Sequence, residues 1–282
     1  MSAARVCNVL TVAGTDPSGG AGLQADLKTF SALGVYATGV VTALVAQSTR
    51  GVSAVHPVPA EFVTAQLEVL LADVRIDAVK IGMLESAPVV RAVADVLRRH
   101  ALPYVVVDPV MVAKSGDRLL AGDAVAALRD ELLPYADLVT PNLPEAADLL
   151  GEDEARDEAQ MRAQLQRLGG LCSGVLLKGG HLAGPDSPDL LLDAGRVHRY
   201  AAARVVTRNT HGTGCTLSAA VAALRAQRPD WPGAVADAKD YLTRALLAAD
   251  RLDVGSGHGQ QHHFHAWWPD AGAPVDGPGV QR

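Results

Sequence analysis

The sequence is organised around Asn209-Thr210-His211-Gly212-Thr213-Gly214-Cys215-Thr216-Leu217-Ser218. Residues 204–207 before it have the composition of a strand end, and residues 217–227 after it are rich in Ala and Leu, which predicts a helix. Two glycines therefore lie where a loop becomes a helix, and glycine lets the backbone approach a ligand closely. The first turn of a helix offers unpaired N–H groups and the positive end of the helix dipole. The pattern predicts an anion site suited to a phosphate.

Cys215 belongs to the same turn. A helix N-terminus lowers the pKa of a thiol and favours the thiolate, so we expect a base beside the phosphate site. The alternative is a glycine-rich turn with a small buried cysteine, and short motifs match by chance often enough to keep that alternative open.

Length and composition narrow the class of protein. The chain has 282 residues, of which 49% are hydrophobic and 20% charged, so it suits one large α/β domain or two small ones. The net charge is −6 and no basic patch is visible, so nucleic acid is not an expected partner. Three isolated cysteines form no metal spacing or disulfide framework, which indicates a reducing, cytoplasmic location. The early apolar run, residues 9–13, is too short for a signal sequence or a membrane span.

Apolar runs alternate with helical patterns along the chain. Strands are predicted at 6–13, 35–45, 77–81, 104–107, 137–140 and 174–177, a hairpin at 190–200, and helices at 23–33, 59–74, 87–99, 121–133, 144–150, 157–168, from 213, and at 234–251. This alternation predicts an α/β fold, with a parallel sheet and helices on both faces. We expect residues 1–254 to form one domain, followed by a Gly-, Pro- and His-rich tail at 255–282.

Polar and glycine residues follow the predicted strands. They are residues 14–16, Gln47, residues 82–83, Asp108, Asn142 and residues 178–180. Ligands of open parallel sheets bind beyond the carboxyl ends of the strands. The sequence therefore predicts a ligand site at this edge.

The loop 14–20 has glycines like those of a P-loop, but it lacks the Lys and Ser or Thr that reach a terminal phosphate. We expect it to let the backbone approach a small substrate, with Asp26 as an acceptor. The alternative is a tight turn in which Asp16 caps the helix.

Side chains with oxygen ligands and two lysines are also expected at this ligand site. Asp108 follows a strand, and Asn142 and Glu145 are hard oxygen ligands suited to Mg²⁺. The alternative for the last two is a helix cap and its capping-box partner. Lys178 before two glycines suits a phosphate, and Lys239 can reach phosphate from the last helix.

Several motifs together resemble the ribokinase-like superfamily, in the branch that contains hydroxymethylpyrimidine and phosphomethylpyrimidine kinases. The run 209–215 is similar to that superfamily's D-T-x-G-A-G-D signature, with Cys215 in place of the final Asp, which acts as the catalytic base in the superfamily. Further similar runs, in order along the chain, are 13–26, 79–83, 107–111, 140–145 and 178–181. The resemblance covers residues 8–265 and implies a three-layer sandwich with a mostly parallel central sheet and a small or absent lid. In the tail, Gln260-Gln261 stands where relatives often carry Pro and Asn.

The resemblance implies a role for each matching residue. Cys215 is the expected catalytic base, beside an anion hole formed by Gly212, Thr213 and Gly214. Gln47 is expected to pair with an aminopyrimidine edge, and Gly14, Asp26, Met83 and Val110 to line the substrate pocket. Asp108, Asn142 and Glu145 are expected near Mg²⁺, and Lys178, Lys239, Thr210 and Thr213 near ATP. Residues 112–119 are an expected flap, and the assembly an expected homodimer.

The resemblance implies ATP-dependent phosphorylation of a hydroxymethylpyrimidine and then of its monophosphate, in thiamine biosynthesis. One alternative is a pyridoxal kinase of the same fold, although pyridoxal has no edge that pairs with both ends of the Gln47 amide. A binding protein without catalytic activity is a second alternative, but binding alone requires no base at Cys215.

Overall fold

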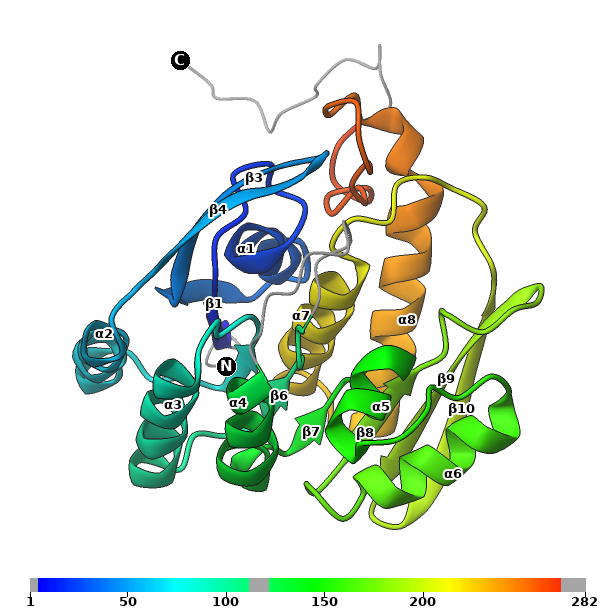
Figure 1. Ribbon diagram of the computed structural model, residues 1–282. Helices are drawn as coiled ribbons and strands as arrows, with labels where there is room; N and C mark the ends of the chain where they lie inside the picture. The colour runs from blue at the N-terminus through cyan, green and yellow to red at the C-terminus, as the bar shows by residue number, and fades with distance from the viewer. Residues whose placement is uncertain (1–4, 112–121, 270–282) are drawn as a thin grey trace, which may run out of the picture.

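The computed structural model describes residues 5–111 and 122–269. An eight-stranded sheet forms its centre, in the order β10-β9-β8-β7-β6-β5-β1-β2 (Figure 1). All neighbours from β8 to β2 are parallel, and β9 and β10 are antiparallel additions at one edge. The strands are β1 (Asn8–Ala13), β2 (Tyr36–Val41), β5 (Ala78–Ile81), β6 (Val105–Val107), β7 (Leu138–Val139), β8 (Val175–Lys178), β9 (Asp186–Asp193) and β10 (Arg196–Ala203).

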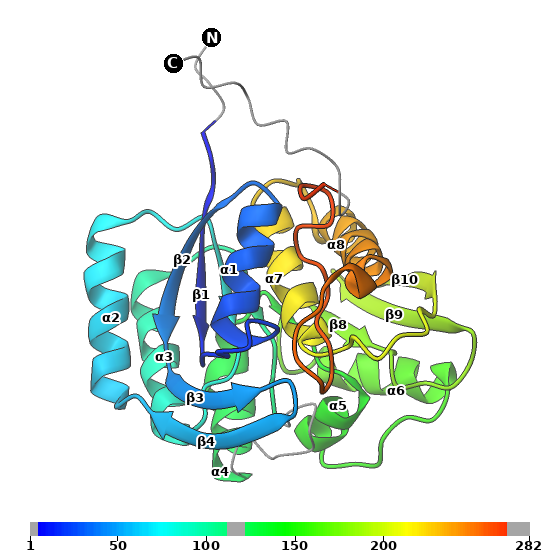
Figure 2. The ribbon, with the colours of Figure 1, turned by 90° about the horizontal axis from the view of Figure 1, so that it is seen from above.

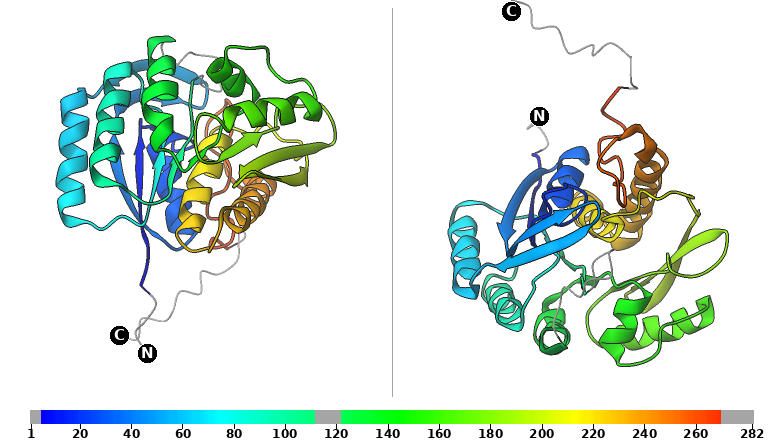
Figure 3. Two further views of the ribbon diagram at one scale, coloured as in Figure 1. Left: turned by 90° about the horizontal axis from the view of Figure 1, so that it is seen from below. Right: turned by 45° about the horizontal axis from the view of Figure 1, so that its top comes forward.

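Helices cover both faces of this sheet (Figure 3), because its strands are apolar on both sides. One face carries α2 (Ala60–Asp73), α3 (Ala87–His100), α4 (Gly122–Ala127), α5 (Leu143–Leu150) and α6 (Glu158–Leu168), and its core extends along the sheet. The opposite face carries α1 (Gly22–Ala32), α7 (Thr213–Arg225) and α8 (Trp231–Leu247) over a second core. The predicted three-layer α/β sandwich is confirmed.

A small hairpin corrects the prediction of one strand at 35–45. The chain leaves the sheet at Thr42, whose N–H donates to the Ala13 carbonyl at 3.1 Å and whose hydroxyl donates to the Met83 carbonyl at 2.6 Å. The hairpin of β3 (Ala43–Ser48) and β4 (Gly51–Pro57) then forms a separate two-stranded sheet (Figure 2). An apolar run does not show where it bends, so the sequence predicted one strand where there are two.

One further prediction about local structure is wrong, and one predicted helix is present but less regular than expected. Residues 204–207 are not a strand: β10 ends at Ala203, and the Arg204 side chain donates to the carbonyls of Gly180 and Gly184. The helix predicted to end at 133 leaves regular α-helical geometry after Ala127, continues as a π turn (Leu128–Leu132) and ends in a 3-10 turn (Leu133–Tyr135). Proline inside that last turn cannot donate a backbone hydrogen bond.

The chain beyond α8 packs onto the domain. It forms a 3-10 turn (Ala249–Arg251) and then runs beside α8 toward the start of α7 (Figure 2). Residues 260–263 are all buried, with at most 5% of each exposed. The domain boundary at 254 stays a prediction, but the first part of the expected tail is in contact with the sandwich. Among the described residues, no helix has the length and apolar character needed to cross a membrane.

Candidate active site

The predicted phosphate-binding turn opens α7. Gly212 precedes the helix with a φ of +78°, a conformation that favours glycine. A Cβ at this position would overlap the carbonyl of Gly20, so the loop after β1 lies directly against the turn. The backbone of Thr213 and Gly214 forms the first turn of α7, where N–H groups lack helical partners. The turn has the geometry of an anion site.

Lys178 and Asp108 meet at this turn from the carboxyl ends of β8 and β6, two strands that β7 separates in the sheet. The Lys178 Nζ atom lies 2.8 Å from Asp108 Oδ1 and 3.8 Å from Glu145 Oε2. A Cβ built on Gly214 would lie 3.2 Å from Lys178 Nζ and 3.7 Å from Asp108 Oδ2. Residues that the sequence placed at separate strand ends therefore converge on one point, as the parallel sheet requires.

Burial and neighbouring charges shift the pKa values of this group. Burial opposes the charged form of Lys178, but Asp108 and Glu145 outweigh it and raise the pKa of Lys178 above its ordinary value. Burial alone would raise the pKa of Asp108, but Lys178 and Lys80 hold it below the usual range. For Glu145 burial prevails and raises the pKa to about 7. Glu145 is therefore the carboxyl here that titrates near neutral pH.

Asn142 and Glu145 form the capping box that was the alternative to metal binding. The Glu145 N–H donates to Asn142 Oδ1 at 2.8 Å, and the Asn142 N–H donates to Glu145 Oε2 at 2.7 Å. The cap uses one oxygen of each side chain, so a metal role for these two residues stays a prediction.

The pKa of Cys215 contradicts the expected thiolate. Burial raises the pKa of this thiol to about 11, and the nearby carboxylates of Asp108 and Asp26 add to the shift. The Lys80 ammonium and the Gly22 N–H lower it, but less than burial raises it. Because the helix dipole acts on a group withdrawn from water, desolvation outweighs it here. Cys215 is a protonated thiol at neutral pH.

Apolar groups line the side of the turn on which the substrate pocket was predicted. A Cβ on Gly14 would lie 3.3 Å from Met83 Sδ and 3.6 Å from the Ala43 carbonyl oxygen. Met83 and Ala43 belong to a small cluster against which Val110 packs. Three residues predicted to line the pocket, Gly14, Met83 and Val110, therefore lie together beneath the β3–β4 hairpin.

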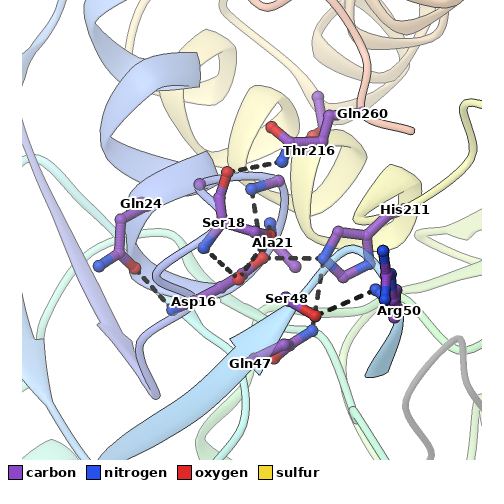
Figure 4. Close-up of polar contacts among 12 residues, drawn as sticks. Asp16, Ser18, Ala21, Gln24, Gln47, Ser48, Arg50, His211, Thr216 and Gln260 are labelled. Atoms are coloured by element: carbon purple, nitrogen blue, oxygen red, sulfur yellow. Dashed lines mark hydrogen bonds and ion pairs between the residues drawn. The ribbon is translucent and has the colours of Figure 1, made fainter. Parts of the chain in front are cut away.

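Gln47 lies at the end of β3, facing the turn (Figure 4). Its Nε2 atom is 3.4 Å from His211 Nε2, and the same histidine nitrogen is 2.8 Å from Asp16 Oδ2. Asp16 also accepts hydrogen bonds from the N–H groups of Ser18 and Ala21. Asp16 thus orders the loop before α1 and connects it to the predicted phosphate-binding turn, a link that the sequence did not predict.

Comparisons with known proteins agree with this geometry. A sequence model of the phosphomethylpyrimidine kinase family matches residues 16–262. The chain belongs to this family. It is 56% identical to the hydroxymethylpyrimidine/phosphomethylpyrimidine kinase of Escherichia coli, over 93% of this chain and 98% of that protein. It is 49% identical to a thiamine biosynthesis bifunctional protein of Geobacter sulfurreducens, over 92% of this chain and 52% of that protein. A pyridoxal kinase from Staphylococcus aureus, solved with AMP-PCP and pyridoxal, is similar in structure (TM-score 0.84, 32% identity, 93% of this chain and 95% of that one).

The kinase contains a buried ion pair that the sequence prediction missed. Lys80 lies in the middle of β5 with none of its surface exposed, and its Nζ is 2.8 Å from Asp26 Oδ2. The Thr11 hydroxyl donates to the same oxygen at 2.6 Å, whereas Asp26 Oδ1 has no partner among the described residues. The sequence contained one signal for this pair, because a lysine inside an apolar strand needs a buried partner. Because Asp26 is fully buried and already paired, its contact with substrate stays a prediction.

Two other expected nucleotide contacts of the kinase have partners within the chain. Lys239 Nζ lies 2.6 Å from Asp189 Oδ2 and 2.9 Å from the Ser187 carbonyl, so it is held at β9. The Thr210 carbonyl accepts from the Thr213 N–H at 3.4 Å inside the predicted phosphate-binding turn. Their roles toward ATP stay predictions, and the expected flap at 112–119 lies outside the described residues.

Proposed function

We propose that this kinase uses ATP to phosphorylate 4-amino-5-hydroxymethyl-2-methylpyrimidine and then its monophosphate, in thiamine biosynthesis. The observation that carries the proposal is the position of Gln47, whose amide lies 3.4 Å from His211, the residue that precedes Gly212. A base-pairing amide and a phosphate-binding turn therefore share one site. The AMP-PCP complex of the similar pyridoxal kinase supports ATP as the donor.

Substrate recognition follows from the chemistry of the amide. The Gln47 side chain offers one acceptor and two donors, which match a ring nitrogen and an exocyclic amine. The apolar cluster beneath the β3–β4 hairpin gives the flat ring and its methyl group a surface without competing polar groups. The hydroxymethyl group then points toward the turn at Gly212–Cys215.

Phosphoryl transfer depends on charge stabilisation at the turn. Preorganised N–H groups and a lysine stabilise charge that develops in the transition state, and Lys178 is held at the turn by Asp108. Only the first step requires removal of an alcohol proton, and Cys215 is the proposed acceptor. Its thiolate is scarce because of the pKa of about 11, and the cationic Lys80 is the neighbour that favours it.

The oxygen atoms around Lys178 fit a magnesium ion that arrives with the nucleotide. The described residues contain no group of three or more His, Cys, Asp or Glu side chains arranged to hold a metal by themselves. Mg²⁺ in kinases is typically held by one or two carboxylates together with phosphate oxygens. Asp108 Oδ2 and Glu145 Oε1 are not used by the lysine or by the capping box, so they are the proposed contacts. When bound, the ion neutralises charge on the transferred phosphoryl group.

We also propose a cytoplasmic homodimer. The cysteines Cys7, Cys172 and Cys215 are all unpaired, as is usual in a reducing compartment. Large apolar side chains are exposed on α2 and on the edge strand β2, where Tyr36 is 62%, Phe62 59% and Val69 75% exposed. Light scattering of the purified protein and fractionation of cells test these two points, and a monomer or a secreted protein would contradict them.

The proposed substrate is tested with Gln47→Leu, using the aminopyrimidine and pyridoxal as alternative substrates. An unpaired polar group in a closed site costs about 1–3 kcal/mol, or roughly 5- to 150-fold in kcat/KM. We expect a loss of this size for the aminopyrimidine and little change for pyridoxal, because only the aminopyrimidine pairs with both ends of the amide. Equal losses on both substrates would make Gln47 structural, and a wild-type preference for pyridoxal would overturn the proposed substrate.

A further inference from the structure

The chain beyond α8 contains a buried polar segment, Gly259–His263, which we call the strap. Gln260, Gln261, His262 and His263 are 5%, 0%, 3% and 4% exposed, although they belong to a stretch rich in Gly and His. Buried polar groups cost free energy unless they are hydrogen-bonded. The partners of the strap therefore show what it holds.

One set of partners lies in the phosphate-binding turn. The His211 N–H donates to the Gly259 carbonyl at 3.0 Å, and Gln261 Nε2 donates to the His211 carbonyl at 2.8 Å. Both backbone groups of the residue before Gly212 are thus fixed by the strap. His263 Nε2 lies 3.1 Å from the Thr216 hydroxyl, in the first turn of α7.

A second partner lies in the loop before α1. Gln260 Nε2 donates to the Ser18 carbonyl at 2.6 Å (Figure 4). A Cβ on Gly20 would lie 2.6 Å from Gln260 Cγ and from His211 Cδ2, so strap, loop and turn are in direct contact. The strap therefore touches the substrate side and the phosphate side of the site through two adjacent glutamines.

The other end of the strap is fixed to α8. The Tyr241 hydroxyl donates to the His263 carbonyl at 2.8 Å, and the His262 N–H donates to the Ala245 carbonyl at 3.0 Å. A long helix thus supports the segment that holds the two loops of the site.

We propose that Gln261 and Gln260 are positioning residues, of which Gln261 sets the phosphate-binding turn and Gln260 sets the substrate loop. The inference rests on the proposed function. A misplacement of about 1 Å in a catalytic group costs on the order of 100-fold in rate, so loss of either amide has a measurable and different effect.

The test compares Gln261→Leu, Gln260→Ala and a control, Gln227→Leu, in steady-state kinetics with the aminopyrimidine and with its monophosphate. We expect Gln261→Leu to lower kcat roughly 10- to 100-fold, by the same factor in both steps, because both use the turn. We expect Gln260→Ala to raise KM for the aminopyrimidine more than it lowers kcat. Gln227 is exposed and donates to the carbonyls of Leu33 and Ala223 at the far end of α7, so its variant loses two side-chain hydrogen bonds away from the site and should keep kcat and KM.

Each outcome decides the inference. If the two strap variants change kcat and KM alike, or if Gln261→Leu lowers the melting temperature while kcat stays at the wild-type value, the strap is structural only. If Gln261→Leu does not fold, Gln261→Asn replaces it, with the same expected fall in kcat because the shorter amide does not reach the His211 carbonyl. Wild-type enzyme that fails to phosphorylate the aminopyrimidine would overturn the proposed function, whereas an active wild type with unaffected strap variants would overturn only this inference.

Discussion

The pKa of Cys215 makes the two phosphorylation steps separable by pH. With a pKa of about 11, only about 0.1% of the thiol is ionised at pH 8, and the fraction rises tenfold with each pH unit up to pH 10. If the thiolate accepts the alcohol proton, the rate of the first step rises by the same factor. The nucleophile of the second step is a phosphate monoester with a pKa of about 6, so that step stays level between pH 7 and 10.

The assay is a single-turnover measurement of each step at saturating ATP and Mg²⁺, between pH 7 and 10. The second step on the same enzyme is the control, because effects of pH on the nucleotide or on folding act on both steps. Cys215→Ala should remove the rise with pH and lower the first-step rate at pH 8 by roughly 10²–10⁴-fold, the usual contribution of a base. A level first step in the wild type, or equal losses in both steps for Cys215→Ala, would refute proton transfer to this thiol.

The two partners of the buried ion pair, Lys80 and Asp26, shift the pKa of Cys215 in opposite directions. Lys80 lowers the pKa of the thiol, and Asp26 and Asp108 raise it, while Lys178 is the other cation that acts on it. Asp26→Asn should therefore move the pH profile of the first step to lower pH, and Lys80→Met should move it to higher pH. Removing one partner of a buried pair costs about 3–5 kcal/mol of stability, whereas replacing both is often tolerated, so Lys80→Met with Asp26→Asn is the folded control. We expect this double variant to move the pH profile of the first step to higher pH, because Lys80 has a larger effect than Asp26 on the pKa of the thiol.

Two further predictions concern the metal and the turn. Glu145→Gln should raise the Mg²⁺ concentration for half-maximal rate several-fold, and that concentration should no longer depend on pH near 7. Burial raises the pKa of Glu145 to about 7, and only the ionised carboxylate, present above that pH, attracts the ion. An unchanged Mg²⁺ titration would leave Glu145 as a capping residue only. Gly212→Ala should lower kcat by more than about 100-fold for both steps and reduce the melting temperature, because its Cβ would overlap the Gly20 carbonyl and displace the loop; near-normal turnover would show that the turn tolerates this displacement.

The local features of the kinase were predictable from neighbouring residues. Apolar runs bounded by glycine located most of the sheet, and the pair Asn142 and Glu145 allowed a capping box to be named before it was seen. The glycine-rich turn before α7 was also predicted, because the backbone freedom of glycine is a property of the residue itself; its φ of +78° at Gly212 was seen only in the structure. The edge of the sheet that carries the site followed from the direction of parallel strands.

The sequence alone did not determine which side chains meet. Asp16 and His211 are 195 residues apart, Asp26 and Lys80 are 54 apart, and Gln261 bonds to His211 across 50 residues. The pKa of Cys215 also depends on burial by distant elements, which reverses the effect expected from its helix position. Propensity, capping and turn geometry act over a few residues, whereas desolvation and Coulomb interactions act through space. Only the tertiary structure therefore decided the ionisation of the site and the contacts of the strap with the turn and the loop.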